Sequence, residues 1–356
     1  MTGRCAGLLL LCALAAGCRP DEQPAAEHRP VAARAATAPE PAATRAVAVT
    51  FDDLPSSAPY DLEVVRDVNR KLLETIRAHR VPAVGFVVGR GAERAGERGA
   101  RMEILRGWVD AGLELGSHTY SHMSVSQRPL EEVEADVVRN ETVLAEVLGA
   151  RWEAGPRWFR HPTLATGDDP RERDAYRRFL EARGYTIAPV TFDNQEWVFA
   201  AAYDRALERG DTAAARCAAE AYVPYLERTF AYFEEMARGL FGRDIPHVLL
   251  LHANRINAEH FGEVAEALRR RGYRFVPLGE ALADEAYRSP DGWASRGGPS
   301  WLHRWAAGRS QPLRPEPREP ELMARLADRA RAPGTAVPRD CSALPVPEAS
   351  PVPQAG

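Results

Sequence analysis

The chain has 356 residues, of which 45% are hydrophobic and 27% are charged, and its formal net charge at pH 7 is −4. This length allows one large α/β domain or two smaller domains, and the composition is that of an ordinary soluble globular protein. A net negative charge without a separate basic cluster argues against non-specific binding of nucleic acid.

Residues 1–17 predict a signal peptide, because Arg4 gives a positive start and residues 6–16 form a short apolar core. About eleven apolar residues are too few to span a bilayer as a permanent helix. The run from Leu14 to Cys18 resembles a bacterial lipoprotein cleavage site, with the lipid on Cys18, although Ala15 stands where that pattern usually has leucine. An ordinary signal-peptidase cut is the alternative. In both cases we expect export, either lipid-anchored in the cell envelope (periplasm or outer membrane) or secreted.

Residues 18–45 are rich in Ala, Pro and charge and have no apolar period, so they predict a flexible tether. After the signal peptide the cysteines are Cys18, Cys217 and Cys341, and no pair has metal-type spacing or indicates a disulfide framework. We interpret Cys217, in an Ala-rich helical stretch, as a buried small side chain.

From residue 46 onward, strands and helices alternate. A first strand begins at residue 46 and is ended by Pro55, and apolar runs predict six more strands, over 83–88, 113–117, 157–160, 185–192, 248–251 and 273–277. A long helical insertion over 200–240 precedes the sixth strand. Alternation of this kind implies an α/β fold with a parallel sheet. About seven units without a Gly-x-Gly-x-x-Gly turn favour a barrel over a dinucleotide-binding fold.

Polar residues follow two of these strands at the point where each ends. Asp52 and Asp53 close the first strand, and adjacent, partly buried carboxylates repel each other unless a cation or proton lies between them. The alternative is an ordinary Asp pair that initiates a turn. His118 and His122 follow the third strand, four residues apart, so that both can point to one position. Two histidines and one carboxylate leave an open coordination position, which suits a catalytic divalent metal.

Five blocks of the sequence then occur in a fixed order: Thr50-Phe-Asp-Asp53, His118-Thr-Tyr-Ser-His122, Arg160-His-Pro162, Glu196-Trp197 and Leu250-Leu-His252. They resemble the five motifs of the polysaccharide deacetylases (NodB homology domain, carbohydrate esterase family four). The resemblance covers about residues 46–287. It implies a distorted (β/α) barrel with about seven strands and metal-dependent removal of acetyl groups from sugar polymers.

The resemblance implies that Asp53, His118 and His122 bind one divalent metal ion, zinc by preference, with cobalt or nickel as alternatives. Asp52 matches the general base of the family and His252 its general acid. A divalent metal activates water near neutral pH and polarises a carbonyl group. Histidine suits the acid role because its unperturbed pKa lies near neutrality.

The third and fourth motifs imply further roles and contain two departures. Arg160 matches the arginine that holds the base and keeps it ionised, and Trp197 matches a wall of the acetyl pocket. Thr163 stands where the family often has an aromatic residue, and a backbone N–H near it would donate to the oxyanion. Glu196 stands where the family usually has Asp to orient the catalytic histidine, and Asp193 is an alternative for that role.

The sequence therefore predicts a deacetylase domain over 46–287, a packing segment over 288–311 and a Pro-rich, largely disordered tail over 312–356. The predicted function is removal of acetyl groups, N-acetyl in preference to O-acetyl, from a polysaccharide such as peptidoglycan or a chitin-like glycan. Two alternatives are a hydrolase of the same fold that acts on a non-sugar amide, and an inactive glycan-binding protein. The complete set of motif residues argues against the inactive protein. The predicted partner is the acetylated glycan, with membrane contact only through Cys18.

Overall fold

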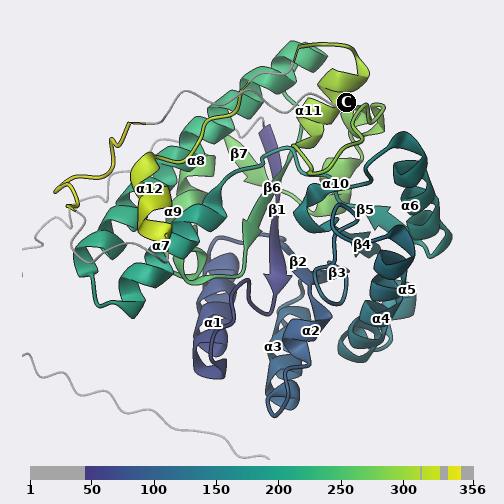
Figure 1. The fold of residues 1–356 in the computed structure, drawn as a ribbon, viewed down its shortest axis with the longest axis horizontal. Helices are drawn as coiled ribbons and strands as arrows, with labels where there is room; N and C mark the ends of the chain where they lie inside the picture. Colours follow the sequence, from purple (N-terminus) through teal and green to yellow (C-terminus); the bar gives the residue numbers. More distant parts are fainter. Residues whose placement is uncertain (1–44, 313–314, 329–335, 346–356) are drawn as a thin grey trace, which may run out of the picture. The chain divides into compact units, whose positions relative to one another are not determined.

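The computed structural model describes residues 45–312, 315–328 and 336–345 (Figure 1). All described residues belong to a single compact unit. The predicted signal peptide, the proposed lipid site at Cys18 and the tether up to residue 44 lie outside the described residues. Within these ranges no helix combines the length and the apolar character that crossing a bilayer requires.

The sheet consists of parallel strands in the order β5-β4-β3-β2-β1-β6, with β7 paired to β1. The strands are β1 (Arg45–Leu54), β2 (Val84–Val87), β3 (Glu114–Ser117), β4 (Arg157–Phe159), β5 (Tyr185–Ile187), β6 (His247–His252) and β7 (Tyr273–Phe275). Strand β1 is central because it pairs with three others. It meets β7 through its first three residues, β6 along 47–52 and β2 from Thr50 onward.

The sheet closes on itself just beyond β5. Phe192 forms an isolated parallel bridge with Leu249 of β6, and the N–H groups of Thr191 and Phe192 both donate to the carbonyl oxygen of Val248. This short contact replaces a full strand ladder at the closure, so the barrel is distorted there. The predicted α/β barrel with seven strands is confirmed.

Alternate residues of β1 face two different cores. Val47, Val49 and Phe51 pack in the large cluster beneath the surrounding helices, whereas Ala46 and Ala48 belong to the smaller cluster that includes inward-facing residues of other strands. Small side chains on the second face leave room for the bulky Phe86 and Trp158. Because side chains alternate along a strand, the same face continues to Thr50 and Asp52.

The helices surround the strands. They are α1 (Leu62–Ala78), α2 (Gly89–Ala92), α3 (Arg98–Asp110), α4 (Leu130–Leu148), α5 (Arg151–Ala154), α6 (Pro170–Ala182), α7 (Glu196–Glu208), α8 (Thr212–Phe241), α9 (Arg255–Arg270), α10 (Leu278–Leu282), α11 (Trp301–Gly308) and α12 (Glu321–Ala327). Figure 1 shows α7, α8, α9 and α12 gathered on one side of β1 and β6, with α4, α5 and α6 on the other side. The predicted helical insertion corresponds to α7 and α8, which are separated at Gly210, where φ is 66°.

The predicted disorder of the tail 312–356 is wrong for the segment Glu321–Ala327, which forms α12. Leu322, Met323 and Leu326 of this helix are buried, and Arg205 of α7 donates through Nε to the carbonyl oxygen of Ala327 at 2.8 Å. The sequence showed one short apolar patch in a Pro-rich region but not the surface against which it packs. That surface is α7, more than 100 residues earlier in the chain.

The sequence analysis expected no disulfide, and the structure shows that this expectation is wrong. Cys217 of α8 is bonded to Cys341, 124 residues later. The tail runs back along α8, where Arg216 donates to the carbonyl oxygens of Arg339 at 2.8 Å and Pro338 at 3.2 Å. Spacing along the sequence gives no sign of this pair, because the two cysteines meet only through tertiary packing.

We expect Cys341→Ser to lower the free energy of unfolding by about 2–5 kcal/mol, because the bond closes a long loop and restricts the unfolded chain. Urea unfolding under oxidising conditions measures this change. Cys217→Ser is the matched control and should give the same loss, and dithiothreitol should destabilise the parent but neither variant. A parent protein whose unfolding midpoint does not respond to dithiothreitol would contradict the disulfide.

Candidate active site

The inner face of β1 carries Asp52 to the carboxyl end of the barrel, where its side chain is 2% exposed. Arg160 follows β4 directly, and its Nη1 lies 3.2 Å from each carboxylate oxygen of Asp52. The other guanidinium nitrogens are also bonded, Nε to the carbonyl oxygen of Ala188 at 2.8 Å and Nη2 to Oγ1 of Thr50 at 3.0 Å. The arginine is therefore fixed in one orientation beside the carboxylate.

The electrostatic setting of Asp52 combines two opposed effects. Burial raises the pKa of Asp52 to about 6, while the positive charge of Arg160 acts to lower it. A carboxyl group with this pKa is mostly ionised at pH 7 and can still take up a proton readily. Such a pKa suits a general base that works near neutral pH.

Asp53, His118 and His122 lie together beside Asp52. Asp53 Oδ1 is 3.7 Å from His118 Nε2 and 3.6 Å from His122 Nε2. Two atoms that are each about 2 Å from one zinc ion lie at most about 4 Å apart. The three ligand atoms all fall within 4.8 Å of one another, so small side-chain rotations would bring them around one ion.

The hydrogen bonds of this cluster also fit a cation. Asp53 Oδ1 is buried and has no hydrogen-bond partner among the described residues. His118 Nδ1 lies 2.8 Å from the carbonyl oxygen of Arg160, and a carbonyl oxygen only accepts, so the ring carries its proton on Nδ1. Burial lowers the pKa of His118 well below its usual value, and the neighbouring His122 acts in the same direction. A neutral imidazole whose Nε2 lone pair faces Asp53 is the form that binds a metal.

The backbone at the cluster adopts uncommon conformations. The φ angles of Asp53, Thr119 and His122 are 64°, 60° and 58°. Each left-handed residue of this kind costs on the order of 1–3 kcal/mol and persists only where its surroundings hold it. Asp and His tolerate the conformation better than most residues. The positive φ of Asp53 interrupts the alternation of β1, so that two adjacent carboxylates reach the same end of the barrel.

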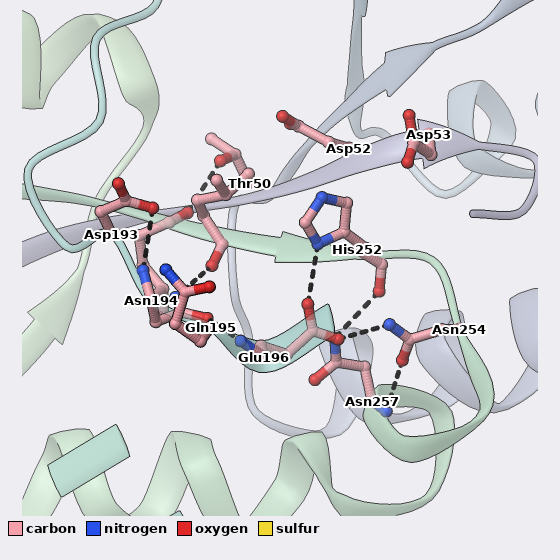
Figure 2. Close-up of polar contacts among 12 residues, drawn as sticks. Thr50, Asp52, Asp53, Asp193, Asn194, Gln195, Glu196, His252, Asn254 and Asn257 are labelled. Atoms are coloured by element: carbon pink, nitrogen blue, oxygen red, sulfur yellow. Dashed lines mark hydrogen bonds and ion pairs between the residues drawn. The ribbon is translucent and has the colours of Figure 1, made fainter. Parts of the chain in front are cut away.

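His252 ends β6, and Figure 2 shows its ring between Glu196 on one side and Asp52 and Asp53 on the other. Its Nδ1 lies 2.7 Å from Glu196 Oε2, and the Glu196 side chain is almost fully buried. Burial acts to lower the pKa of His252, but the Glu196 carboxylate outweighs it and the pKa rises to about 9. The ring is therefore protonated at neutral pH.

The structure brings Glu196 to His252 and leaves Asp193 apart from it. The Asp193 carboxylate accepts a hydrogen bond from the N–H of Asn194 at 2.9 Å, and in Figure 2 it lies away from the imidazole. Glu196 is the first residue of α7, and its carboxylate reaches the imidazole.

We expect Glu196→Gln to lower the pKa of His252, since the substitution removes the negative charge that raises it. The sign follows from linkage: protonated His252 stabilises the fold fully below its unfolded pKa of about 6.5. That stabilisation is lost as the pH rises through about 9 in the parent. NMR titration of the imidazole in metal-free protein measures the shift. An unchanged pKa would show that Glu196 does not set the protonation of the ring.

Trp197 lies at the edge of the site. Trp197 is 58% exposed and lines a cavity of about 400 Å³ together with Asp53 and His252. A second cavity of about 730 Å³ reaches Asp53 and His122, and the loop 57–59 lines both cavities. Two cavities therefore open beside the cation cluster. This arrangement suits access by an extended molecule.

The loop that carries Thr163 is held by the C-terminal packing segment. Thr163 and Leu164 both have a φ of 54°. Arg304 of α11 is fully buried and donates to the carbonyl oxygen of Leu164 and, at 2.9 Å, to Oγ1 of Thr166. Gly298 packs so closely that a Cβ there would lie 2.0 Å from the carbonyl oxygen of Leu164. These contacts were not predicted, because the segment lies beyond the family motifs.

Tyr222, Asn254 and Asn257 were also missed. The sequence gave none of these three residues a role in the site. All three belong to one buried hydrogen-bond network behind His252. One sequence signal could have indicated Asn254: it stands at the expected start of a helix, two residues after His252 of the fifth motif.

A parallel barrel with carboxylates and histidines at the carboxyl ends of its strands defines a class of α/β barrel proteins whose site lies at that face. Residues 40–179 match the family model described as polysaccharide deacetylase. These residues contain the first three of the five motif blocks, and over them the predicted resemblance to the polysaccharide deacetylases, carbohydrate esterase family four, is confirmed.

Curated relatives match over part of their length. The peptidoglycan-N-acetylglucosamine deacetylase of Bacillus cereus is 29% identical over 116 residues, which are 33% of this chain and 35% of that protein. The chitooligosaccharide deacetylase of a Bradyrhizobium species is 33% identical over 119 residues, which are 33% of this chain and 46% of that protein. The matched stretches thus span between a third and a half of these relatives.

Solved structures give similar matches. A family 4 carbohydrate esterase from Streptomyces lividans in complex with acetate is 20% identical, with a TM-score of 0.42 over 67% of this chain and 97% of that chain. A mutant of BA3943, described as a pseudoenzyme of carbohydrate esterase family four with restored enzymatic activity, is 18% identical. Its TM-score is 0.45 over 68% of this chain and 69% of that chain.

Proposed function

We propose that this protein is an exported, metal-dependent hydrolase that removes acetyl groups from a polysaccharide, N-acetyl in preference to O-acetyl. The observation that carries the proposal is the convergence of a buried base with a pKa of about 6, a protonated histidine and a three-residue cation cluster. The names of the two curated relatives favour peptidoglycan or a chitin-like glycan as the substrate.

The proposed roles follow from the protonation states. A divalent ion held by Asp53, His118 and His122 would supply a Lewis acid that activates water and polarises the acetyl carbonyl. Two imidazoles and one carboxylate suit zinc, with cobalt or nickel as substitutes. Asp52 accepts the proton of the attacking water. His252 donates a proton from Nε2 to the departing amine nitrogen, because its Nδ1 is bonded to Glu196.

Three other residues support these steps in the proposal. Arg160 holds the Asp52 carboxylate in place through its guanidinium group. Trp197 forms a wall for the acetyl group, and the exposed face of its ring suits contact with a sugar. A backbone N–H near Thr163 donates to the developing oxyanion.

Export with a lipid anchor on Cys18 is part of the same proposal. The disulfide between Cys217 and Cys341 supports export, because such bonds persist in oxidising compartments and are rare in the cytosol. Intact-mass measurement of membrane-extracted protein should show a diacylglyceryl group at Cys18. A soluble mature form cut at another position would point to ordinary secretion.

The test is acetate release from peptidoglycan, chitin oligomers and acetylated xylan by purified protein. We expect release from the N-acetylated polymers, loss after treatment with a chelator, and recovery when zinc or cobalt is added. The double variant Asp52→Asn with His252→Ala is the control for contaminating activity. Release from xylan alone would overturn the N-acetyl preference. No release from any polymer, with hydrolysis of a non-sugar amide instead, would favour the alternative hydrolase.

A further inference from the structure

The Glu196 carboxylate is buried behind His252 and bonded through both oxygens. Oε2 accepts from His252 Nδ1 at 2.7 Å. Oε1 accepts from two side-chain amides, from Nδ2 of Asn254 and, at 2.8 Å, from Nδ2 of Asn257. Figure 2 shows the carboxylate between the imidazole and this pair of amides. Among the described residues, the only charged partner bonded to the carboxylate is thus the imidazole itself.

The two amides are held by the start of α9. Asn254 is the N-cap of this helix, and its Oδ1 accepts the N–H of Asn257 at 3.0 Å. Asn257 Nδ2 also donates to the carbonyl oxygen of His252 at 2.9 Å. Each asparagine is therefore held by a second hydrogen bond of its amide group, and each donates an N–H of Nδ2 to Glu196.

The Asn257 amide is also held from another helix. Because the Glu196 carboxylate and the His252 carbonyl oxygen only accept, Asn257 turns its Nδ2 toward them and leaves Oδ1 free to accept. Tyr222 of α8 is fully buried, and its hydroxyl donates to this Oδ1 at 2.6 Å. Helix α8 carries none of the five motif blocks. It nevertheless reaches the catalytic region through the hydroxyl group of Tyr222.

We propose that Asn254 and Asn257 form an amide clamp that positions Glu196, with Tyr222 fixing the clamp, and that the enzyme depends on it for proton donation by His252. Neutral donors hold the carboxylate in place without neutralising its charge, so the charge stays directed at the imidazole. The clamp also explains how a Glu serves where the family usually has Asp: its longer, more flexible side chain needs additional anchors. These are positioning residues, which act through Glu196. This inference rests on the proposed function.

The first test separates clamping from helix capping at Asn254. Serine can cap a helix but has no amide N–H for Glu196, whereas alanine can do neither. We expect Asn254→Ser and Asn254→Ala to lower kcat by the same 10- to 100-fold, the usual effect of losing such an outer partner, with KM unchanged. Only Asn254→Ala should lose the stability of the cap. Asp169→Ala, which removes the exposed N-cap of α6, is the control and should lose stability without losing kcat.

The other two members give graded variants. Asn257→Ala should lower kcat by the same order as Asn254→Ser, and Tyr222→Phe, which removes only the hydroxyl, should cause a smaller loss. In a Glu196→Gln background, Asn254→Ser should cause little further loss, because both changes act through one carboxylate. Parent-like kcat in both Asn254→Ser and Asn257→Ala would overturn the clamp, as would fully additive effects with Glu196→Gln.

An NMR measurement keeps the clamp testable if the protein proves not to be a deacetylase. In metal-free protein we expect a protected downfield signal from the His252 Nδ1 proton, and its loss in Asn254→Ser but not in Asp169→Ala. This result does not depend on any substrate. A signal that survives in Asn254→Ser would refute the clamp, whereas absent acetate release with a clamp-dependent signal would refute only the proposed reaction.

Discussion

Asp52→Asn and His252→Ala are each expected to lower kcat for acetate release by about 10²- to 10⁴-fold, the usual contribution of one positioned proton transfer. The two side chains come from β1 and β6, which pair directly, with Asp52 opposite His252 in the register. Metal content should not change in either variant, because neither residue belongs to the proposed cation cluster. Steady-state kinetics with metal analysis of the same preparations provides the measurement.

The pH dependence of the parent and its variants tests the assignment of roles. The parent profile should be bell-shaped, and its basic limb should vanish in His252→Ala, because that limb reports deprotonation of the acid. The two substitutions should combine less than additively, since both residues serve one transition state. If His252→Ala keeps a kcat near that of the parent, another residue is the acid and the fifth motif match is a coincidence.

Purified protein should retain close to one equivalent of a divalent metal after mild dialysis, and His118→Ala with His122→Ala should lose it. The physical reason is that Asp53 alone offers one carboxylate, which is too few ligands to hold an ion. His79→Ala with His260→Ala is the matched control, because these histidines pair with Glu266 and Glu263 away from the site. A full equivalent of metal in the site variant would show that the ligands lie elsewhere.

The sequence predicted the parts of the fold that local pattern determines. The small and β-branched residues of β1 indicated a buried strand, and period-two alternation explains why Asp52 faces the barrel interior. His118 was expected beside the carboxylates because parallel strands deliver their ends to one face. The charge of Arg160 was expected to keep Asp52 ionised and acts in that direction, but burial has the larger effect and raises the pKa of Asp52 to about 6.

The contacts that the sequence did not predict join segments that are far apart in the chain. The bond between Cys217 and Cys341, the packing of α12 on α7 and the contact of Arg304 with Leu164 each depend on tertiary proximity. None has a local signature. Tyr222 has the helical spacing of a core residue and is one, but its hydroxyl also meets Asn257. Periodicity indicates that a side chain is buried and says nothing about its polar atom.

The disulfide secures the helices behind one half of the site and not the other half. All three residues proposed to bind the cation precede residue 123 and lie outside the two segments that the bond joins. Helix α7, which begins with Glu196, packs against α8 and α12, and the bond ties the segment that follows α12 to α8. Protein produced in a reducing cytosol should therefore bind metal normally yet turn over slowly, and oxidative refolding should restore the rate without adding metal.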